Sequence, residues 1–277
     1  MTARLPGERD IISIADGTWA EEVFLAQETQ RAALDLLDRG RMSTWEKGDA
    51  IGVAVLVGLL AKAIKTGRAA VLLAEHGLIV DAEGLYRTLL LTLAVVRWIC
   101  HHPDDAHKRA ARYVDICLAQ QYRFRNAARS SPALRSVVAG ELGQHLENLV
   151  SALVDRHGLQ EVARLADECP WKSDAYLTMH TSLSVPYDIF YRRASQILHA
   201  QDITEHVDPF PESGSVIVRP FPTDVWGPEV ILLTCQTLLV LLSELNRSLD
   251  CEMDDTLDVL RQRAEEMQVK RQKARGA

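Results

Sequence analysis

The sequence lacks most of the motifs that mark an enzyme with a bound cofactor. Its 277 residues contain no glycine-rich phosphate loop, no G-x-S-x-G turn and no H-E-x-x-H helix. The five cysteines are odd in number and form no C-x-x-C pair: Cys100, Cys117, Cys169, Cys235 and Cys251. Such spacing indicates buried thiols of a reducing compartment, not a disulfide framework or a zinc cage. We expect no cofactor and no metal.

Long apolar runs are also scarce. MTARLPGERD at the start is followed by polar residues, where a secretory signal needs an apolar stretch. The two most apolar runs, 51–64 and 230–242, are shorter than the roughly 20 residues that cross a bilayer. We expect core helices, a cytoplasmic protein and no membrane contact.

Net positive charge is concentrated at one end of the chain. The net charge is −7, but residues 261–277 carry +4, so the rest of the chain carries −11. An acidic body repels phosphate backbones, which argues against a duplex-DNA binder. RNA stays open as a partner, through this tail or through the basic run YRFRNAARS (122–130), which is equally typical of a solvated helix end.

Helical patterns fill nearly all of the sequence, with apolar residues at helical spacing. Gly77 is a natural residue to end one helix, Asp81 to cap the next, and Pro103 to stop that helix near Cys100. The helices we expect run over about 18–37, 45–65, a segment ending at Gly77, 81–100, 104–130, two segments around Gly158, 186–200, 229–249 and a last helix from about 249.

Strand character is limited to SVIVR within a proline-rich segment near 207–228. Five prolines between 209 and 228 exclude a helix there. The sequence therefore predicts an all-α fold: a single multi-helix, bundle-like domain of eight to nine helices with a proline-rich excursion, in which SVIVR either pairs as a short β-hairpin or crosses the surface.

The last helix carries a regular apolar seam. We divide the chain into a helical domain, 1–250, and a charged C-terminal helix with a frayed basic tail, 251–277. The residues of the seam are spaced 4, 4, 3, 4 and 3 apart: Leu249, Met253, Leu257, Leu260, Ala264 and Met267. A helix this short is marginal alone, so the seam must lie on its own domain or on a partner chain. We predict a homodimer.

The most specific chemical pattern is YRRASQILHA (191–200). At about 100° per residue, Arg192, Ser195 and His199 share one helical stripe. Tyr191 lies four residues before Ser195 and joins the same side. A cation, a hydroxyl and an imidazole on one face are able to hold a phosphate and move a proton.

This stripe resembles the R-x(4–6)-H hallmark of the HEPN superfamily of helical proteins, which His199 fits with either Arg192 or Arg193. Many HEPN members are metal-independent RNases of toxin–antitoxin and antiphage systems. The resemblance implies that His199 is the acid/base for attack by a ribose 2′-OH and that Arg192 stabilises the phosphate.

A longer stretch, about 60–205, is similar to an uncharacterised all-helical bacterial family, a domain of unknown function. Its pattern is G-x(4)-A-x(4)-R-[ST]-L-x-E followed by Y-x3-S-x3-H. The first motif falls on Gly77, Ala82, Arg87, Thr88 and Leu89, and the expected glutamate falls on Leu91. The resemblance implies that Arg87 and Tyr191 support the site, and Leu91 indicates a degenerate member.

A structural interpretation stays open for each residue. Arg87 is typical of an arginine paired with a buried carboxylate, since Glu83 is one turn away. His199 is typical of a cation at a helix end. A histidine and aspartate cluster at the junction 101–107 matches no known ligand spacing.

Two functions follow. The first is a non-catalytic or degenerate helical module of a bacterial defence or toxin-type system; the alternative is a HEPN-like metal-independent ribonuclease. Either way, we expect Arg87 to lie close to the helix 186–200, because buried polar groups need partners.

Overall fold

A computed structural model describes residues 19–43, 50–101, 105–131, 140–168, 207–210, 215–218 and 226–276. This part of the chain forms eight helices and two short strands, in the order α1 (Ala20–Ser43), α2 (Ala50–Glu75), α3 (Ile79–Cys100), α4 (Ala106–Ser130), α6 (Glu141–His157), α7 (Leu159–Asp167), β1 (Val207–Phe210), β2 (Ser215–Val218), α12 (Gly227–Leu249) and α13 (Asp254–Gly276). The all-α, multi-helix fold expected from the sequence is confirmed.

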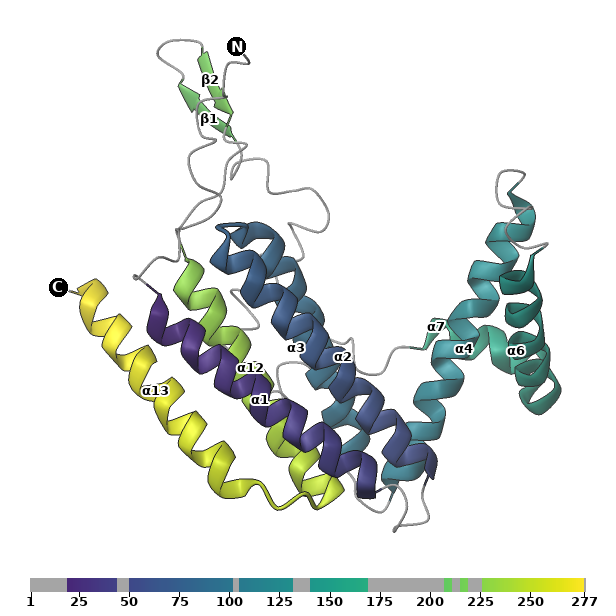
Figure 1. Ribbon diagram of the computed structural model, residues 1–277. Helices are drawn as coiled ribbons and strands as arrows, with labels where there is room; N and C mark the ends of the chain where they lie inside the picture. Colours follow the sequence, from purple (N-terminus) through teal and green to yellow (C-terminus); the bar gives the residue numbers. More distant parts are fainter. Residues whose placement is uncertain are drawn as a thin grey trace.

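Five helices form a bundle in which α12 is surrounded by the other four (Figure 1). This helix packs against α1, α2, α3 and α13. Most of its circumference is buried between Val230 and Leu249, and one stripe that includes Gln236, Val240 and Arg247 is partly exposed. Because a helix that is apolar on most sides is stable only when those sides are covered, α12 takes the centre of the bundle.

The polar residues of α12 are satisfied within the bundle. Thr234 donates a hydrogen bond to the carbonyl of Val230 at 2.7 Å. Asn246, 3% exposed, accepts the backbone N–H of Met253 and donates to Asp254, both at 3.0 Å. Its side chain therefore fixes the turn between α12 and α13, since an unpaired buried amide is costly.

Helices α2 and α3 form the hairpin that the sequence indicates. Gly77 has φ 73°, in the left-handed region that glycine favours at a helix end. The predicted cap is wrong by one turn: Leu78 is the capping residue and Asp81 lies in the first turn of α3. There the carboxylate still offsets the positive end of the helix dipole.

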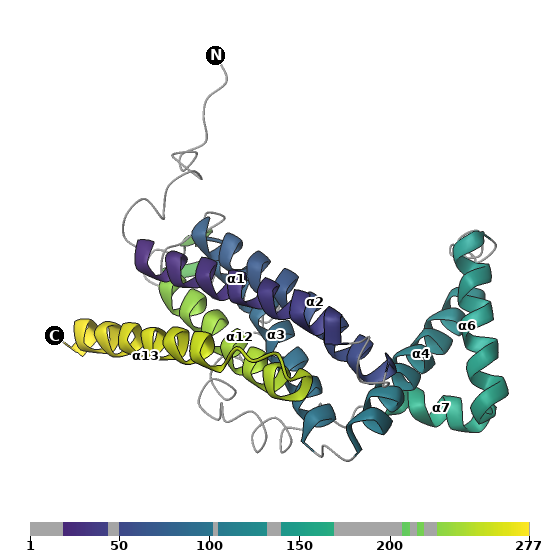
Figure 2. The same cartoon turned by 60° about the horizontal axis from the view of Figure 1, so that its bottom comes forward.

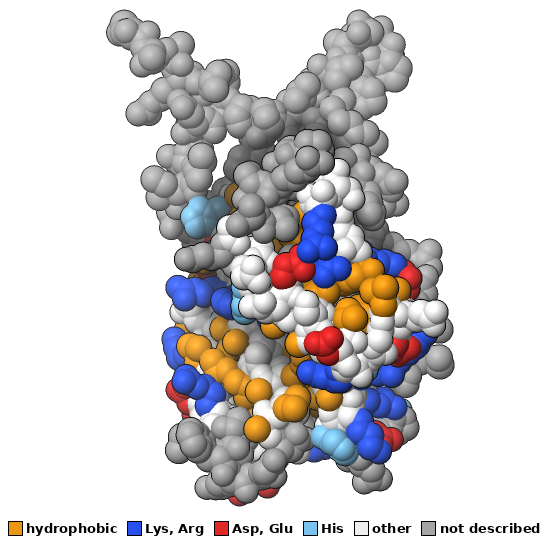
Figure 3. All heavy atoms as spheres, turned by 90° about the vertical axis from the view of Figure 1, so that its right-hand side faces the viewer, with side chains coloured by type: hydrophobic (Ala, Val, Ile, Leu, Met, Phe, Trp, Pro, Cys, Tyr) orange, Lys and Arg blue, Asp and Glu red, His pale blue; other side chains and the backbone are white. Residues whose placement is uncertain are grey.

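Helices α4, α6 and α7 form an arm that projects from the bundle (Figures 1 and 2). The bundle contacts α4 through α2 and α3, while α6 and α7 pack on α4 and on each other. Gly158, with φ 79°, ends α6 and precedes α7, as the sequence predicts. Seen from the arm's side, hydrophobic side chains gather in patches flanked by Lys and Arg side chains (Figure 3).

The apolar seam of the last helix is buried within the chain. All six of its residues are at most 7% exposed and belong to the main hydrophobic core. Helix α13 packs against α12 and α1, so of the two alternatives for the seam, its own domain is the one observed. The homodimer stays a prediction, without the seam as its support.

Two helix boundaries differ from the sequence-based expectation. The segment 38–44, predicted as a break, continues α1 to Ser43, and α2 runs ten residues past Lys65, to Glu75. Tertiary contacts explain the first: Arg39 donates a 2.9 Å hydrogen bond to the carbonyl of Cys251. A Cβ on Gly40 would lie only 3.1 Å from Leu249, so helix α1 is held close to α12 there.

The proline-rich segment contains a short hairpin, one of the two alternatives expected for it. β1 and β2 pair antiparallel, with Val207 opposite Val218 and Phe210 opposite Ser215. This two-stranded ladder is the one sheet in the described part of the chain.

Helices α2 and α12 are long and apolar enough to span a membrane by length and composition. The apolar runs 51–64 and 230–242 are too short to cross a bilayer, as expected, but the helices that contain them are long enough. In the most apolar window of each helix, 44% of α2 and 67% of α12 is buried inside the protein. Helices in a bundle core pass the same test, and the cytoplasmic location stays a prediction.

Candidate functional site

The stripe predicted as a catalytic face lies outside the described residues. Tyr191, Arg192, Ser195 and His199 all belong to the segment 169–206. The expected proximity of Arg87 to the helix 186–200 is therefore not tested. Arg87 is the member of the proposed composite site that lies within the described part of the chain.

Arg87 lies on α3, half-buried, one turn after Glu83. Glu83 is 2% exposed, and both side chains take part in interactions. A buried carboxylate and a guanidinium at this spacing share one face of the helix. This spacing is the one that the structural interpretation requires, in which Arg87 offsets the cost of burying Glu83.

The neighbouring polar residues of α3 serve the packing between α3 and α12. Tyr86 is 1% exposed, and Thr237 of α12 donates a 3.3 Å hydrogen bond to its hydroxyl oxygen. Burial raises the pKa of Tyr86, so the phenol is neutral at physiological pH. Thr92 donates to the carbonyl of Thr88 at 2.9 Å. The Thr237–Tyr86 hydrogen bond joins α12 to α3, whereas that of Thr92 stays within α3.

Leu91 stands at the position where the resembled pattern has a glutamate. Its side chain is half-buried and packs against the main hydrophobic core. A leucine provides no carboxylate to orient an arginine or to transfer a proton. At this position α3 contributes packing and no titratable group.

The arginine-rich run 122–130 is neutralised by the arm itself. Arg125 and Arg129 both contact Glu147 of α6, at 3.2 and 2.6 Å, and Arg123 pairs with Asp167 of α7. Arg125 also lies 4.9 Å from the centre of the Tyr122 ring. The run is thus engaged in docking α4 against α6 and α7, which supports the helix-end interpretation over RNA contact.

A second charged cluster docks α7. Arg112 of α4 donates two hydrogen bonds to Glu168, at 2.7 and 2.6 Å, and Arg164 reaches the same carboxylate at 3.2 Å. The hydrogen bonds from Arg112 hold the pKa of Glu168 below its usual range. Two parallel bonds fix the direction of both groups, so this cluster sets the place of α7 on α4.

One histidine of the arm faces a carboxylate. The Nε2 atom of His157 lies 2.9 Å from Asp115, and Arg156 contacts the other oxygen of Asp115 at 3.0 Å. The cluster joins α4 to α6 on the arm. Its geometry is that of an ion-paired helix contact.

Of the histidine and aspartate cluster near 101–107, His102 and Asp104 lie outside the described residues; in the part of the chain that the structure describes, no three His, Cys, Asp or Glu side chains gather. Asp105 precedes α4 and binds Lys108 at 2.9 Å. Its side chain makes no capping hydrogen bond, and its carboxylate stands at the positive end of the α4 dipole.

Most cations of the basic tail are bound to the chain's own acids. Arg271 contacts Glu22 at 2.5 Å, Lys270 contacts Glu21 at 2.7 Å, and Arg263 pairs with Glu28. Arg261 contacts Asp258 at 2.6 Å. Three of the tail's six basic residues therefore hold α13 against the acidic first half of α1, and Arg261 pairs within α13, so these four are less available to a phosphate backbone.

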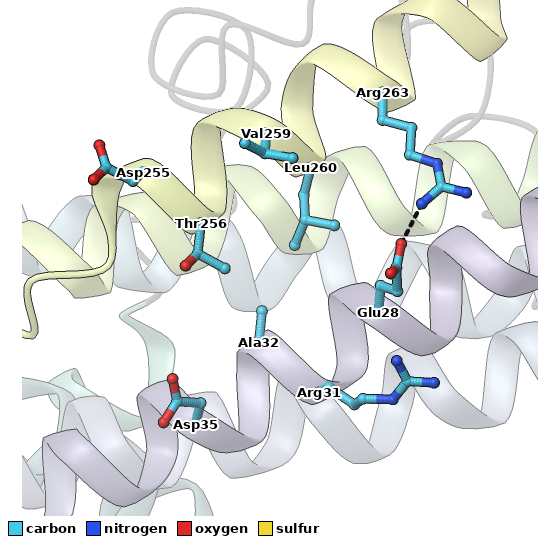
Figure 4. Close-up of a pocket in the computed structure, with 9 residues that line it drawn as sticks. All are labelled: Glu28, Arg31, Ala32, Asp35, Asp255, Thr256, Val259, Leu260 and Arg263. Carbon is cyan, nitrogen blue, oxygen red and sulfur yellow. Dashed lines mark hydrogen bonds and ion pairs between the residues drawn. The ribbon is translucent and has the colours of Figure 1, made fainter.

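The described structure also has a groove that the sequence does not indicate, between α1 and α13 (Figure 4). Its volume is about 630 Å³, and its lining comes from both helices: Glu28, Arg31, Ala32, Asp35, Asp255, Thr256, Val259, Leu260 and Arg263. The two sets of residues are more than 200 positions apart. No local pattern predicts the groove, because it arises only when α13 folds back along α1.

The fold and these clusters define an all-α protein with a helical bundle and a charge-paired arm. The profile of a family of unknown function, DUF5677, matches residues 53–214. The chain belongs to this family. The match covers α2, α3 and the arm, whereas α1, α12 and α13 lie outside it. No curated protein and no solved structure matches the chain.

Proposed function

We propose that the protein is a non-catalytic helical interaction module of a bacterial defence or toxin-type system. The observation that carries the proposal is Leu91. At the position where the resembled pattern has a glutamate, this chain has a leucine that packs on the core. A site built on that pattern lacks its carboxylate here, which favours a degenerate member that binds partners without turnover.

The charge distribution supports the same function. An RNase needs cations free to hold a phosphate backbone. Arg123, Arg125 and Arg129 on the arm, and most of the basic tail, contact carboxylates of the same chain. The net charge of −7 adds long-range repulsion of nucleic acid. A cytoplasmic location and a homodimeric state belong to this proposal as predictions.

The second candidate is a HEPN-like metal-independent ribonuclease. The spacing of Arg192, Ser195 and His199 on one helical stripe favours it. His199 is then the general acid/base, Arg192 stabilises the phosphate, and Tyr191 and Arg87 support them. Half-buried Arg87 on α3 is the described residue that such a site would include.

An RNA cleavage assay with four proteins separates the two functions: the parent, His199→Ala, Arg192→Ala and His145→Ala. His145 is exposed on α6 and serves as the matched control. We expect no cleavage above background by any of them. Three results together would contradict the proposal. The parent cleaves RNA, His199→Ala loses 10²–10⁴-fold of that activity, which is the usual contribution of a general acid/base, and His145→Ala keeps the activity of the parent.

Thermal denaturation of the same proteins completes the experiment. If His199 is a core residue, its replacement is expected to cost about 1–3 kcal/mol through loss of a buried hydrogen-bonding partner and to lower Tm by several degrees. His145→Ala is expected to leave Tm unchanged, because an exposed side chain contributes little. A chelator added to the cleavage assay distinguishes a contaminating metal-dependent nuclease from the chain itself.

A further inference from the structure

The groove between α1 and α13 has the shape and length of a helix-docking site. The pairs Glu21–Lys270 and Glu28–Arg263 show that the two helices run antiparallel. Glu28 and Arg263 close one end of the groove, and Asp35 and Asp255 stand at the other end on opposite helices (Figure 4). Seven residues of α1 separate the two ends, which is about 10 Å. The groove therefore accommodates about two turns of another helix.

The floor and one wall of the groove are apolar. Ala32 and Leu260 are 6% and 7% exposed and lie at its base, and Leu260 points from α13 toward α1 (Figure 4). Val259 is 66% exposed, the highest value among the large hydrophobic residues described. An aliphatic side chain from a partner would bury Val259 and complete the packing over Leu260.

The open end of the groove is acidic. Residues 250–258 include five carboxylates and no lysine or arginine. Asp255 makes no ion pair with any described residue, and Asp35 contacts Arg39 at 3.3 Å with both side chains about half exposed, a contact worth little. The helix dipole accounts for Asp254 and Asp255 in the first turn of α13. It does not account for Asp35 on α1 or for the exposed Val259 beside them.

We propose that this groove docks a basic, amphipathic helical segment of a partner protein. The partner's aliphatic residues, three or four apart, pack on Val259 and Leu260, and a lysine or arginine one turn away lies between Asp35 and Asp255. Helix-in-groove recognition uses this combination of spaced apolar anchors and flanking charge. The inference rests on the proposed interaction role and gives that role a surface and a partner chemistry.

The test uses the full chain and a synthetic, fluorescently labelled 18-residue helix with leucines at positions i, i+3 and i+7 and lysines beside them. A second peptide replaces every lysine by glutamate. Binding is followed by fluorescence anisotropy at 150 mM salt, where long-range attraction is screened. We expect saturable binding of the lysine peptide and none of the glutamate peptide.

Two matched pairs of variants locate the site. Asp35→Asn with Asp255→Asn is expected to weaken binding tenfold or more. Asp81→Asn with Asp155→Asn makes the same change in net charge at exposed residues elsewhere, on α3 and α6, and is expected to change binding less than twofold. Likewise Val259→Ser is expected to weaken binding and Val269→Ser, on the same helix and 48% exposed, to leave it unchanged.

Three results would overturn the proposal: no binding of the lysine peptide by the parent, equal weakening by both aspartate pairs, or a dimer of the parent that Val259→Ser dissociates. The last result would show that a second copy occupies the groove. RNA cleavage by the parent would overturn the proposed function and leave the peptide result standing, so the two failures are distinguishable.

Discussion

Single glycines show how differently one residue type is used in this fold. A Cβ on Gly227 would lie 2.2 Å from the ring of Trp19, which is itself 5% exposed. Gly58 lies in the interior of α2 with nothing within 4 Å of its virtual Cβ. The first glycine lets the start of α12 approach the start of α1, and the second has no such role.

Gly227→Ala is therefore expected to lower the free energy of unfolding by about 2 kcal/mol, the usual cost of overpacking a core. The ring of Trp19 must move, because no flexible side chain end is available to yield. Gly58→Ala is expected to raise the free energy of unfolding by roughly 0.5–1 kcal/mol, since alanine is the better helix former. Chemical denaturation of both variants measures the contrast, and equal effects of the two would contradict it.

The described cysteines follow the expectation from their spacing. Cys235 and Cys251 are buried, and Cys100 and Cys117 are partly buried. Burial raises the pKa of Cys235 to about 12 and that of Cys100 to about 11. Thiols with such values are protonated at neutral pH and react slowly, which is typical of packing residues.

At the scale of the helix, docking on the arm combines a small apolar contact with directional charge contacts. α7 is nine residues long and buries Val162, Leu165 and Ala166. The two hydrogen bonds from Arg112 of α4 to Glu168 fix the orientation of α7 on α4. A helix of this length is not stable alone, so its order follows from its docking on α4.

Acid is expected to release α7. The pKa of Glu168 is lowered in the folded state, so its contribution is present above the ordinary carboxyl value and is lost as pH falls through the folded value. We expect α7 amides to exchange hydrogen faster at pH 3 than at pH 6, relative to α12 amides. Hydrogen exchange read by mass spectrometry, corrected for the intrinsic rate, measures this.

The matched variants are Glu168→Gln and Glu161→Gln. Glu168→Gln is expected to speed exchange of α7 at pH 6 and to remove most of the acid effect. Glu161 contacts Arg164 within α7 and makes no contact with α4 among the described pairs, so Glu161→Gln is expected to leave docking unchanged. An acid effect that survives in Glu168→Gln would assign it to other groups of the arm.

For the whole molecule, helices outside the family match complete the core. α12 is central to the bundle and α13 covers it, yet the match to the family ends at residue 214. The apolar faces of α2 and α3 are buried by α12. The family segment of this chain therefore depends on its C-terminal helices for a closed core.

Leu257→Ala tests this closure. Leu257 is fully buried, so its truncation is expected to lower the free energy of unfolding by about 3 kcal/mol, within the usual range for buried leucine. Val259→Ala, two residues away and 66% exposed, is expected to change it by less than about 0.5 kcal/mol. Thermal denaturation of the two variants measures the difference. Equal stability would show that α13 is not part of the folding unit.

Local sequence determined most of the helices and their ends. The left-handed glycines Gly77 and Gly158, the end of α3 at Cys100 and the largely apolar helix α12 each follow from residues close in the chain. The continuation of α1 to Ser43 does not, because contacts to Cys251 and Leu249 outweigh the local break signal. Propensity is a weak term that tertiary contacts override.

Tertiary structure alone decided where the charges and the seam are used. The sequence shows a basic run, a basic tail and an apolar seam, and each is open to an external partner. In the fold, the run contacts Glu147 and Asp167, much of the tail contacts acids of α1, and the seam is buried on α12 and α1. These partners lie tens to hundreds of residues away. Spacing within a helix fixes which face a side chain is on, and only the folded chain fixes what that face meets.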